Sequence, residues 1–441
     1  MHIYRSFFFF CDLVVFFVLV VFGIFFFHPV FSYANLVSHL VIFIPVFFVS
    51  TFFLWLCGFY NMRVMEVKYG LSVHILVAFA ASALVSVSGI YFLFPLLHII
   101  TPRRVLVFVL VLYFVYVYLI RRFEFKFVRF KVYVFGESET ISEIVTNIKK
   151  FRIYEIAVLE PFPDPLKKYD ISDGAKIVVG SKLFREHPES WPVVCKDFIA
   201  RGFGMTTDFN FFSRLFCRLS YESMNDDMWF LRGVGNRTEN NEIYDSLKRL
   251  TDLIIALTLL IPCAAVGAVI YLLILAIDRY QPIFVQKREG LMGRSFDLYK
   301  FQTIVPATRE SPEEKVTKLG ALLRRFRLDE IPQLINVFNG TLSFVGPRPL
   351  WIGEIPLLNK NIPYHSLRTI VKPGITGWAQ LNYKAPPNHF ILDKEAAPED
   401  EVYESAMRRF SYDIWYIKNR NFFLDLGIII RTGIRMFIKD K

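Results

Sequence analysis

Four long apolar runs open the sequence, and they constrain the fold more than any other feature. They cover residues 6–27, 37–60, 71–94 and 105–120. Each run is close to the roughly 20 residues that an α-helix needs to span a bilayer. The first run has no small-residue cleavage site after it, so it is interpreted as a helix and not as a signal peptide. Four transmembrane helices are therefore predicted within residues 1–122.

Basic residues flank alternate ends of these runs. Most of them follow the second and fourth runs, and the full set is Arg5, Arg63, Lys68, Arg121, Arg122, Lys126 and Arg129. Arg103 and Arg104 oppose the pattern but are outweighed. The positive-inside rule then places the N-terminus and everything after residue 121 in the cytoplasm. We expect a multi-pass protein of the cell inner (cytoplasmic) membrane.

The charge and cysteine content narrow the class of partner. The net charge is +11, and 54% of the residues are hydrophobic. An anionic membrane face and a phosphorylated substrate explain this charge better than a nucleic acid, because aromatic RNA-binding signatures are absent. The five cysteines form no C-x-x-C pair and the histidines have no zinc-ligand spacing, which favours a reducing compartment.

The hydrophobic period changes after the fourth run. Short β-like runs alternate with helical patterns, and the runs are KVYVFG (131–136), YEIAVLE (154–160) and AKIVVG (175–180). This alternation predicts a small doubly wound, Rossmann-like α/β module over residues 123–231. Gly136 stands alone where a dinucleotide site needs G-x-G-x-x-G, so a degenerate regulatory or oligomerising module is favoured. Residues 232–247 are predicted as a linker. A homodimer through the membrane part or this module stays open.

A fifth apolar run, from Leu253 to Ile277, is long enough to cross a membrane. Basic residues flank both of its ends, and Pro262 near its middle would kink or break a helix. A re-entrant hairpin over residues 251–277, with both ends cytoplasmic, is favoured over an ordinary fifth span. Residues 421–438 mix apolar and basic residues, which predicts an amphipathic helix on the inner leaflet.

Two adjacent carboxylates, Asp329 and Glu330, lie between two helical patterns. Pro332 is tolerated only in the first turn of a helix, so the pair is expected at a helix N-terminus. The dipole and the free N–H groups there favour anions. Arg324 precedes the pair, and Arg348 follows it between two prolines. This arrangement predicts a site that handles phosphate.

Six sequence blocks in this order resemble the bacterial sugar transferases, the polyprenyl-phosphate hexose-1-phosphate transferases. The blocks are KRLTD (248–252), the apolar run with Pro262, QPIFVQKREGLMGRSFDLYKF (281–301), LRRFRLDEIPQLINVFNGTLSFVGPRP (323–349), VKPGITGWAQLNY (371–383) and YDIWYIKNRNFFLDLGIII (412–430). The resemblance implies a mostly helical monotopic phosphoglycosyl transferase domain over residues 248–441. The four helices and the α/β module resemble the long members, which start capsule, exopolysaccharide or O-antigen assembly.

The resemblance also implies a reaction. A sugar-1-phosphate would move from a UDP-sugar to polyprenyl (undecaprenyl) phosphate, with release of UMP. Asp329 would be the nucleophile and Glu330 its partner at a Mg²⁺ ion. A carboxylate can attack phosphorus and leave again, and Mg²⁺ is commonly held by carboxylates and substrate phosphates. The alternative for Asp329 is a helix cap.

Further phosphate-binding residues follow from the same resemblance. Arg324 and Arg348 suit bidentate phosphate contacts. Lys300 closes the LYKF motif, with an exposed strand-end lysine as the alternative. Gln380 belongs to the PGITGWAQ loop, which is expected beside the nucleotide or, alternatively, forms a turn with a packed tryptophan. Arg294, Lys287 and Arg288 form a basic stretch before the acid pair, and the sequence does not indicate which of the three binds phosphate.

Two positions depart from the family pattern. Gln302 and Ile304 stand where a basic residue and a methionine usually follow KF, which removes one positive charge near the site. A nucleotide-sugar dehydratase is a second hypothesis, because Tyr244 and Lys248 form a Y-x-x-x-K, but the glycine-rich loop is missing. A non-enzymatic membrane scaffold or sensor of polysaccharide assembly is a third, which the intact acid pair disfavours. The sequence does not name the sugar.

Overall fold

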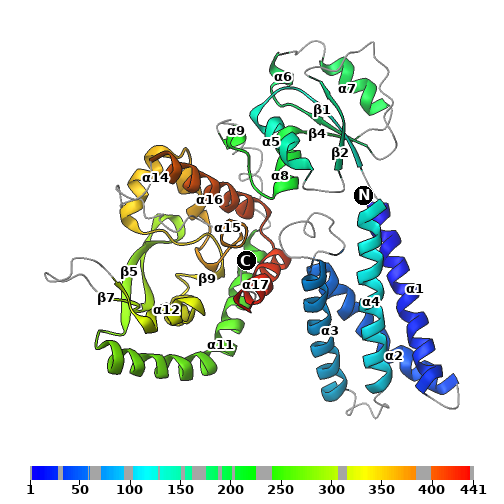
Figure 1. The fold of residues 1–441 in the computed structure, drawn as a ribbon, viewed down its shortest axis with the longest axis horizontal. Helices are drawn as coiled ribbons and strands as arrows, with labels where there is room; N and C mark the ends of the chain where they lie inside the picture. The colour runs from blue at the N-terminus through cyan, green and yellow to red at the C-terminus, as the bar shows by residue number, and fades with distance from the viewer. Residues whose placement is uncertain are drawn as a thin grey trace. The chain divides into compact units, whose positions relative to one another are not determined.

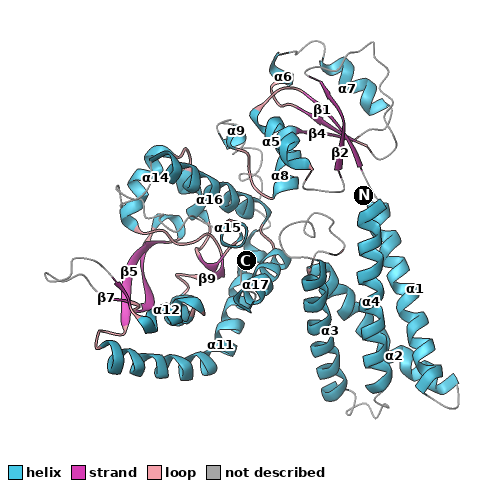
Figure 2. Cartoon of the chain, viewed as in Figure 1, coloured by secondary structure: helices cyan, strands magenta, loops and turns pink. Residues whose placement is uncertain are grey.

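The computed structural model describes residues 2–27, 33–57, 59, 71–93, 103–127, 130–149, 154–160, 175–186, 191–200, 204–224, 241–305, 315–383 and 399–437. Contacts divide the chain into two compact units, Met1–Asp208 and Phe209–Lys441. Each unit has its own hydrophobic core. The protein is mostly helical, with small sheets (Figures 1 and 2).

All four N-terminal apolar runs are helical. They form α1 (His2–Phe27), α2 (Tyr33–Leu56), α3 (Leu71–Leu93) and α4 (Arg103–Phe127), which pack into a bundle (Figure 1). Phe16 and Tyr113 meet edge-to-face in its core, with ring centroids 5.1 Å apart. Among the described residues, four helices are long and apolar enough to cross a membrane: α1, α2, α4 and the stretch Ile243–Asp278. The apolar stretch of α3, Ile75–Ile90, is shorter.

An ion pair lies inside this bundle. The Arg121 guanidinium is 3.4 Å from the Asp12 carboxylate, and the two side chains are 4% and 0% exposed. Charged side chains are costly at membrane depth unless they are paired, so this contact ties α4 to α1. Of the basic residues that flank the end of the fourth apolar run, Arg121 is buried against Asp12, whereas Arg122 is exposed and donates to the Tyr118 hydroxyl at 3.2 Å.

A parallel sheet follows the bundle. Its strands are β1 (Phe130–Phe135), β2 (Tyr154–Glu160), β3 (Lys176–Val179) and β4 (Met205–Thr207), in the order β2-β1-β3-β4. Its helices are α5 (Glu139–Ile148), α6 (Leu183–Glu186) and α7 (Trp191–Ala200). The strand order reverses between β1 and β3, the position at which doubly wound folds bind ligands.

A buried carboxylate fills that position. Asp208 accepts hydrogen bonds from the Ser181 backbone N–H (3.1 Å), the Ser181 hydroxyl and the Ser138 hydroxyl (3.1 Å). The glycines that end the two strands, Gly136 and Gly180, leave no room for a side chain between them. An acidic group at this point disfavours a phosphate there, because the two would repel each other.

The C-terminal unit combines short helices with two-stranded sheets. Its helices are α8 (Asp208–Phe216), α9 (Tyr221–Met224), α11 (Asn241–Leu273), η3 (Ile274–Asp278), η4 (Leu291–Gly293), α12 (Lys318–Arg325), η5 (Leu328–Gln333), α13 (Leu334–Asn339), η6 (Ile352–Glu354), α14 (Ile355–Asn361), η7 (His365–Ile370), α15 (Trp378–Asn382), α16 (Glu399–Asn419) and α17 (Phe422–Phe437). Its strand pairs are antiparallel β5 (Ile283–Glu289) and β6 (Ser295–Phe301), antiparallel β7 (Ile304–Val305) and β8 (Lys315–Val316), and parallel β9 (Ser343–Val345) and β10 (Gly374–Thr376).

Residues 209–224 belong to this C-terminal unit. Stacked Trp378 and Trp415 rings, 4.9 Å apart, donate their indole N–H groups to the carbonyls of Cys217 (2.9 Å) and Ser213 (3.0 Å). The sequence analysis assigned this segment to the α/β module. Of the predicted linker, residues 232–240 lie outside the described residues, and the remainder forms the first turns of α11.

Helix α11 is bent, and other elements of the protein leave most of its middle uncovered (Figure 1). Pro262 lies inside it and removes a backbone hydrogen bond, which permits a kink. Apolar side chains along its middle face outward, with Ile261 79% and Leu257 64% exposed. An apolar helix that the protein itself does not cover is typical of a segment that contacts lipid.

Both ends of α11 contact the same small group of elements. Near its start, Arg249 donates to the carbonyls of Val337 (2.6 Å) and Phe338 (2.8 Å) at the end of α13. Further along, the Cα of Gly267 faces Ile331 in η5. Roughly 18 straight helical residues would extend about 27 Å, whereas the 7 or so residues from Ile331 to Phe338 extend only about 10 Å. The bend therefore brings the later part of α11 back to the elements that its first turns contact.

Candidate active site

The acid pair occupies the start of a helical turn. Helix α12 is capped by Thr317, whose hydroxyl accepts from the Gly320 N–H at 2.8 Å. The chain then turns through Arg327 in the left-handed region (φ 55°), and η5 begins with Asp329 and Glu330 in its first turn. The structure thus places the pair at a helical start, as predicted, although this first turn is a 3₁₀ turn.

The electrostatics of Asp329 differ from the expectation. Burial raises the pKa of the Asp329 carboxyl above its ordinary value, and the neighbouring Glu330 raises it further. Lys300, the backbone N–H of Asp329 itself and Arg324 lower it, but they do not outweigh burial. The sequence analysis expected the helix start to keep Asp329 ionised; that effect is present but is not dominant.

Two of the predicted cations, Lys300 and Arg324, act on the pair, and a third, Arg348, acts on Lys300. Lys300 lies on β6: burial and then Arg348 lower the pKa of its ammonium group, whereas Glu330 and Asp329 raise it. Arg324 projects from α12 and donates from Nε to the Thr303 hydroxyl at 2.9 Å. Lys300 and Arg324 are therefore linked electrostatically to Asp329, whereas Arg348 acts on Lys300.

The two other predicted residues lie elsewhere. Arg294 follows η4 in the β5–β6 turn, where it is exposed. Gln380 lies on α15, where its carbonyl accepts from Arg435 of α17 at 2.9 Å. The side-chain amide atoms of Gln380 are buried and have no hydrogen-bond partner among the described residues. No contact of either residue with the dyad occurs in the described part of the chain, so their roles stay predictions.

The glycines of two family motifs serve close backbone packing. The backbone N–H of Gly346 donates to Thr376 (2.9 Å), and that of Gly374 donates to Pro347 (2.9 Å). A Cβ at Gly374 would lie 2.1 Å from the Gly346 nitrogen, and one at Gly377 would lie 2.2 Å from its carbonyl oxygen. These positions accept only glycine, which makes the PGITGWAQ segment a support for the loop that carries Arg348.

Asn336 is a positioning residue that the sequence analysis did not single out. Its buried side chain donates to the Asp297 carbonyl at 2.7 Å and accepts from the Tyr299 N–H at 3.2 Å. It thereby fixes β6, which carries Lys300, against the helix that follows the dyad. Periodicity gave no signal for it, because Asn336 lies opposite the apolar positions Ile331, Leu334, Ile335 and Phe338 on the helix. Once the fold buries Asn336, its amide must be hydrogen-bonded.

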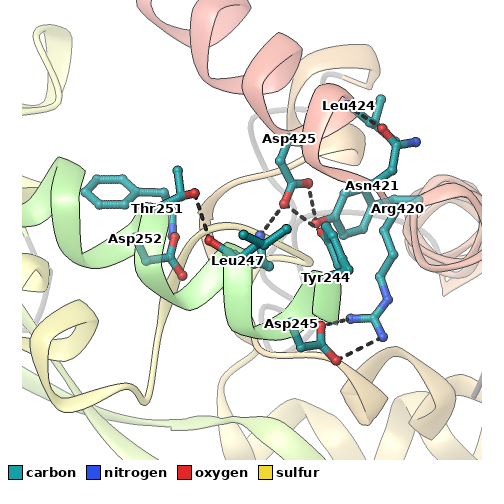
Figure 3. Close-up of polar contacts among 12 residues, drawn as sticks. Tyr244, Asp245, Leu247, Thr251, Asp252, Arg420, Asn421, Leu424 and Asp425 are labelled. Atoms are coloured by element: carbon teal, nitrogen blue, oxygen red, sulfur yellow. Dashed lines mark hydrogen bonds and ion pairs between the residues drawn. The ribbon is translucent and has the colours of Figure 1, made fainter. Parts of the chain in front are cut away.

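The KRLTD block has a structural explanation. Tyr244 and Lys248 both donate to the Asp425 carboxylate of α17, at 2.7 and 2.6 Å (Figure 3). Tyr416 donates to the other oxygen of Asp425 at 2.7 Å, and Asp252 accepts from the Phe344 N–H at 3.0 Å. Burial and Asp425 raise the pKa of Tyr244 well above its ordinary value. The Y-x-x-x-K pattern therefore anchors α11, which removes the support for a dehydratase.

The side chain and backbone of Gln302, the first departure from the family pattern, are both hydrogen-bonded at the end of β6. The Gln302 side chain donates to the Ile304 carbonyl at 2.6 Å, and its backbone N–H donates to Pro282 at 2.8 Å. Gln302 thus stabilises the strand end next to the site, and its amide is already engaged.

The acid pair fits a hard divalent cation. Adjacent carboxylates offer oxygen ligands to such a cation. Glu330 raises the pKa of Asp329, and a bound cation would oppose this rise because it stabilises both negative charges. Within the described residues, no group of three or more His, Cys, Asp or Glu side chains could hold a metal. Two carboxylates completed by substrate phosphates are the arrangement that Mg²⁺ commonly adopts.

Comparison with known proteins gives one consistent result. The family model described as "Bacterial sugar transferase" matches residues 243–439. The chain is 38% identical to the uncharacterized sugar transferase EpsL of Bacillus subtilis over 201 residues, which cover 44% of this chain and 89% of that protein. It is 33% identical to the UDP-glucose:undecaprenyl-phosphate glucose-1-phosphate transferase of Escherichia coli, over 44% of this chain and 40% of that protein.

A third relative has a different sugar in its name. The chain is 31% identical to the UDP-N-acetylgalactosamine-undecaprenyl-phosphate N-acetylgalactosaminephosphotransferase of Aeromonas hydrophila, over 43% of each chain. The matched region thus spans less than half the length of these two longer relatives, but nearly all of the Bacillus protein. The family model and the near-complete match to a sugar transferase agree with the six ordered motifs, and this chain belongs to the bacterial sugar transferase family.

Proposed function

We propose that this protein transfers a sugar-1-phosphate from a UDP-sugar to polyprenyl (undecaprenyl) phosphate and releases UMP. The reaction takes place at the cytoplasmic face of the inner membrane and is the first membrane step in the synthesis of an exopolysaccharide, capsule or O-antigen. Relatives named for UDP-glucose and UDP-N-acetylgalactosamine support the donor and acceptor classes. These relatives do not identify the sugar that this protein transfers, because they are named for different sugars.

One observation carries the proposal: a half-buried acid pair beside cations that form no ion pair with it. Lys300 and Arg324 act on Asp329 electrostatically, yet no ion pair to Asp329 or Glu330 occurs in the described residues. Both substrates are anions, so the site must attract negative phosphates and still present a nucleophile. Phosphoryl transfer depends mainly on such positioning and charge neutralisation.

The chemistry proceeds in two displacements. A carboxylate oxygen of Asp329 attacks the sugar-linked phosphorus of the donor, and the bond from that phosphorus to the bridging oxygen breaks. UMP leaves with the electron pair, and a covalent aspartyl-phosphosugar remains. A phosphate oxygen of the polyprenyl phosphate then attacks the same phosphorus. The Asp329 carboxylate is released, and the lipid-linked diphosphate sugar forms.

Glu330, with Asp329, would hold the Mg²⁺ ion, which supplies charge neutralisation for the phosphates. The residues of the chain supply the remaining functions. Lys300 and Arg324 attract and orient phosphate oxygens, and partial burial limits the access of water to the Asp329 carboxylate. Exclusion of water protects a phosphoaspartate from hydrolysis.

The bend of α11 supports a monotopic placement of the site. Residues at both ends of this helix contact α13 and η5 of a single unit. A straight crossing would separate these ends by the roughly 30 Å of the bilayer core. A hairpin over residues 251–277 keeps the dyad on the face where UDP-sugars occur. The predicted amphipathic helix corresponds to α17, whose Arg435 and Arg431 contact α15: Arg435 bonds its carbonyls, and Arg431 lies 5.7 Å from the Trp378 ring.

The alternative is a membrane-anchored scaffold or sensor without enzyme activity. Its support was the lost positive charge at Gln302. The engagement of Gln302 with Ile304, together with Lys300 and Arg324 beside an intact dyad, leaves that alternative with little support.

Transfer is tested with membranes that contain the full chain, Mg²⁺, polyprenyl phosphate and a panel of UDP-sugars labelled in the sugar-linked phosphate. The wild type is expected to produce labelled lipid and free UMP. Asp329→Asn is expected to lower transfer by at least about three orders of magnitude and to trap no label on the protein, because an amide is not a nucleophile for phosphorus.

Asp297→Asn is the matched control. Asp297 lies on β6 with Lys300, but its side chain is 47% exposed and, among the described residues, its one ion pair is the surface contact with Lys287. This variant should retain transfer. Full activity of Asp329→Asn would exclude Asp329 as the nucleophile, and failure of the wild type with every UDP-sugar would favour the scaffold.

A further inference from the structure

Arg348 is the centre of a group of partly buried cations. It lowers the pKa of three others, Arg288, Lys300 and Arg409, and in each case only burial has a larger effect. The pKa of Arg288 falls to about 10. These residues come from β5, β6 and α16 and from the loop after β9. Like charges repel one another when they are gathered away from water, so the arrangement calls for an anion.

The cations are close enough to affect one another, and carboxylates offset them only from a distance: Glu354 raises the pKa of Arg288 and Arg409, and Asp413 raises that of Arg409. In the described part of the chain, the side chains of Lys300, Arg348 and Arg409 donate no hydrogen bond, and no carboxylate lies within 4.0 Å of them. Among the same described residues, Glu354 makes no ion pair. The N–H groups of these side chains are therefore available to the oxygen atoms of a ligand.

Backbone contacts hold the cluster in place. Arg368 donates to the Arg348 carbonyl at 2.8 Å and to the Asp413 carboxylate at 2.9 Å, in an ion pair with side chains 4% and 2% exposed. Arg288 donates to the Pro349 carbonyl at 3.4 Å. Arg409 lies one helical turn before Asp413, on the same face of α16, and so faces the same loop.

We propose that Arg288, Arg348 and Arg409 form a second phosphate seat that adjoins the phosphate position at Asp329. This proposal rests on the proposed function and deepens it. Lys300 is within electrostatic range of both the dyad and Arg348, so the linked phosphates of a diphosphate can share it. Guanidinium groups match phosphate oxygens in pairs. The seat holds either the phosphate of the UMP moiety or that of the lipid acceptor.

The test measures binding of UMP and of uridine to the purified full chain, and steady-state kinetics for both substrates. The wild type is expected to bind UMP more tightly than uridine. Arg409→Gln should weaken UMP binding about tenfold and leave uridine binding unchanged, because one charged hydrogen-bonding group is lost. Arg408→Gln is the matched control, because this substitution removes the same charge from α16. The native Arg408 side chain donates to Tyr221 (3.1 Å) and Glu404 (3.1 Å) and not to the proposed seat.

The two phosphate sources give different results. If the acceptor occupies the seat, Arg409→Gln leaves UMP binding unchanged and raises the KM for polyprenyl phosphate about tenfold. Arg288→Lys keeps the positive charge but loses the two parallel N–H donors of the guanidinium group, so its affinity for the same ligand should fall by less than that of Arg409→Gln. If Arg409→Gln does not fold, Arg288→Lys tests the proposal in its place. Unchanged UMP binding and unchanged KM values in both variants would overturn the seat. UMP binding through the seat without any transfer by the wild type would instead overturn the proposed function.

Discussion

At the residue scale, His365 is the side chain whose ionisation the fold controls most clearly. It is buried on η7, its Nδ1 lies 3.1 Å from the Asn359 amide oxygen, and its ring lies 5.5 Å from that of Phe410. Burial, then Arg368 and Arg409, lower its pKa to about 3. The imidazole is therefore neutral in the folded protein at every pH where the protein is expected to work.

This lowered pKa predicts a specific acid instability. Unfolded histidine titrates near 6.5, so the unfolded state binds more protons than the folded state between that pH and about 3. Stability is complete above about 6.5 and falls below it by up to about 1.4 kcal/mol per pH unit. His365→Gln should show a shallower loss of stability between pH 6.5 and 4.5, measured by thermal unfolding of the full chain in detergent. Parallel curves for variant and wild type would contradict the prediction.

At the element scale, α11 is the segment whose geometry decides where the site lies. Its anchor near residue 249 and its contact at Gly267 face one unit, and the residues between them expose apolar side chains. A proline inside a helix permits such a bend, because it removes one backbone hydrogen bond and displaces the preceding turn.

A pair of cysteines tests this geometry. Ser246→Cys and Gln281→Cys place exposed thiols before and after the bend, in a chain whose five native cysteines are replaced by serine or alanine. A hairpin predicts that an impermeant maleimide labels both positions from the same side of the membrane, and that this side is the cytoplasmic one. Labelling of the two positions from opposite sides would show that α11 crosses the bilayer.

At the scale of the whole molecule, the match to the family model begins at residue 243, but the folded C-terminal unit begins earlier. Residues 209–224 accept the indole hydrogen bonds of Trp378 and Trp415 and contribute Leu219 and Met224 to the core. The segment is therefore part of the catalytic unit and not only a connection to it.

Truncation tests this assignment. A chain that starts at residue 209 should keep transfer activity, because the core and both indole hydrogen bonds stay intact. A chain that starts at residue 225 removes these partners and should unfold at a temperature lower by several degrees, since each lost hydrogen bond and buried side chain costs about 1–3 kcal/mol. Equal melting temperatures for the two chains, measured by tryptophan fluorescence, would refute the assignment.

The sequence alone determined the local elements and the position of the acid pair at a helical start. Apolar periodicity predicted the helices around residues 319–338, and Pro332 located the acid pair at a helical start, because these signals depend only on neighbouring residues. The parallel strands after the membrane helices were predicted in the same way.

Tertiary structure alone decided which charges meet and which are buried. Arg288 and Arg409 come within electrostatic range of Arg348 from distant segments, and Arg121, which flanks the fourth apolar run in the sequence, is buried against Asp12. The motif glycines became packing positions for the same reason. A sequence pattern gives the face of each element, but burial and charge depend on the partner that covers that face, and only the assembled fold supplies the partner.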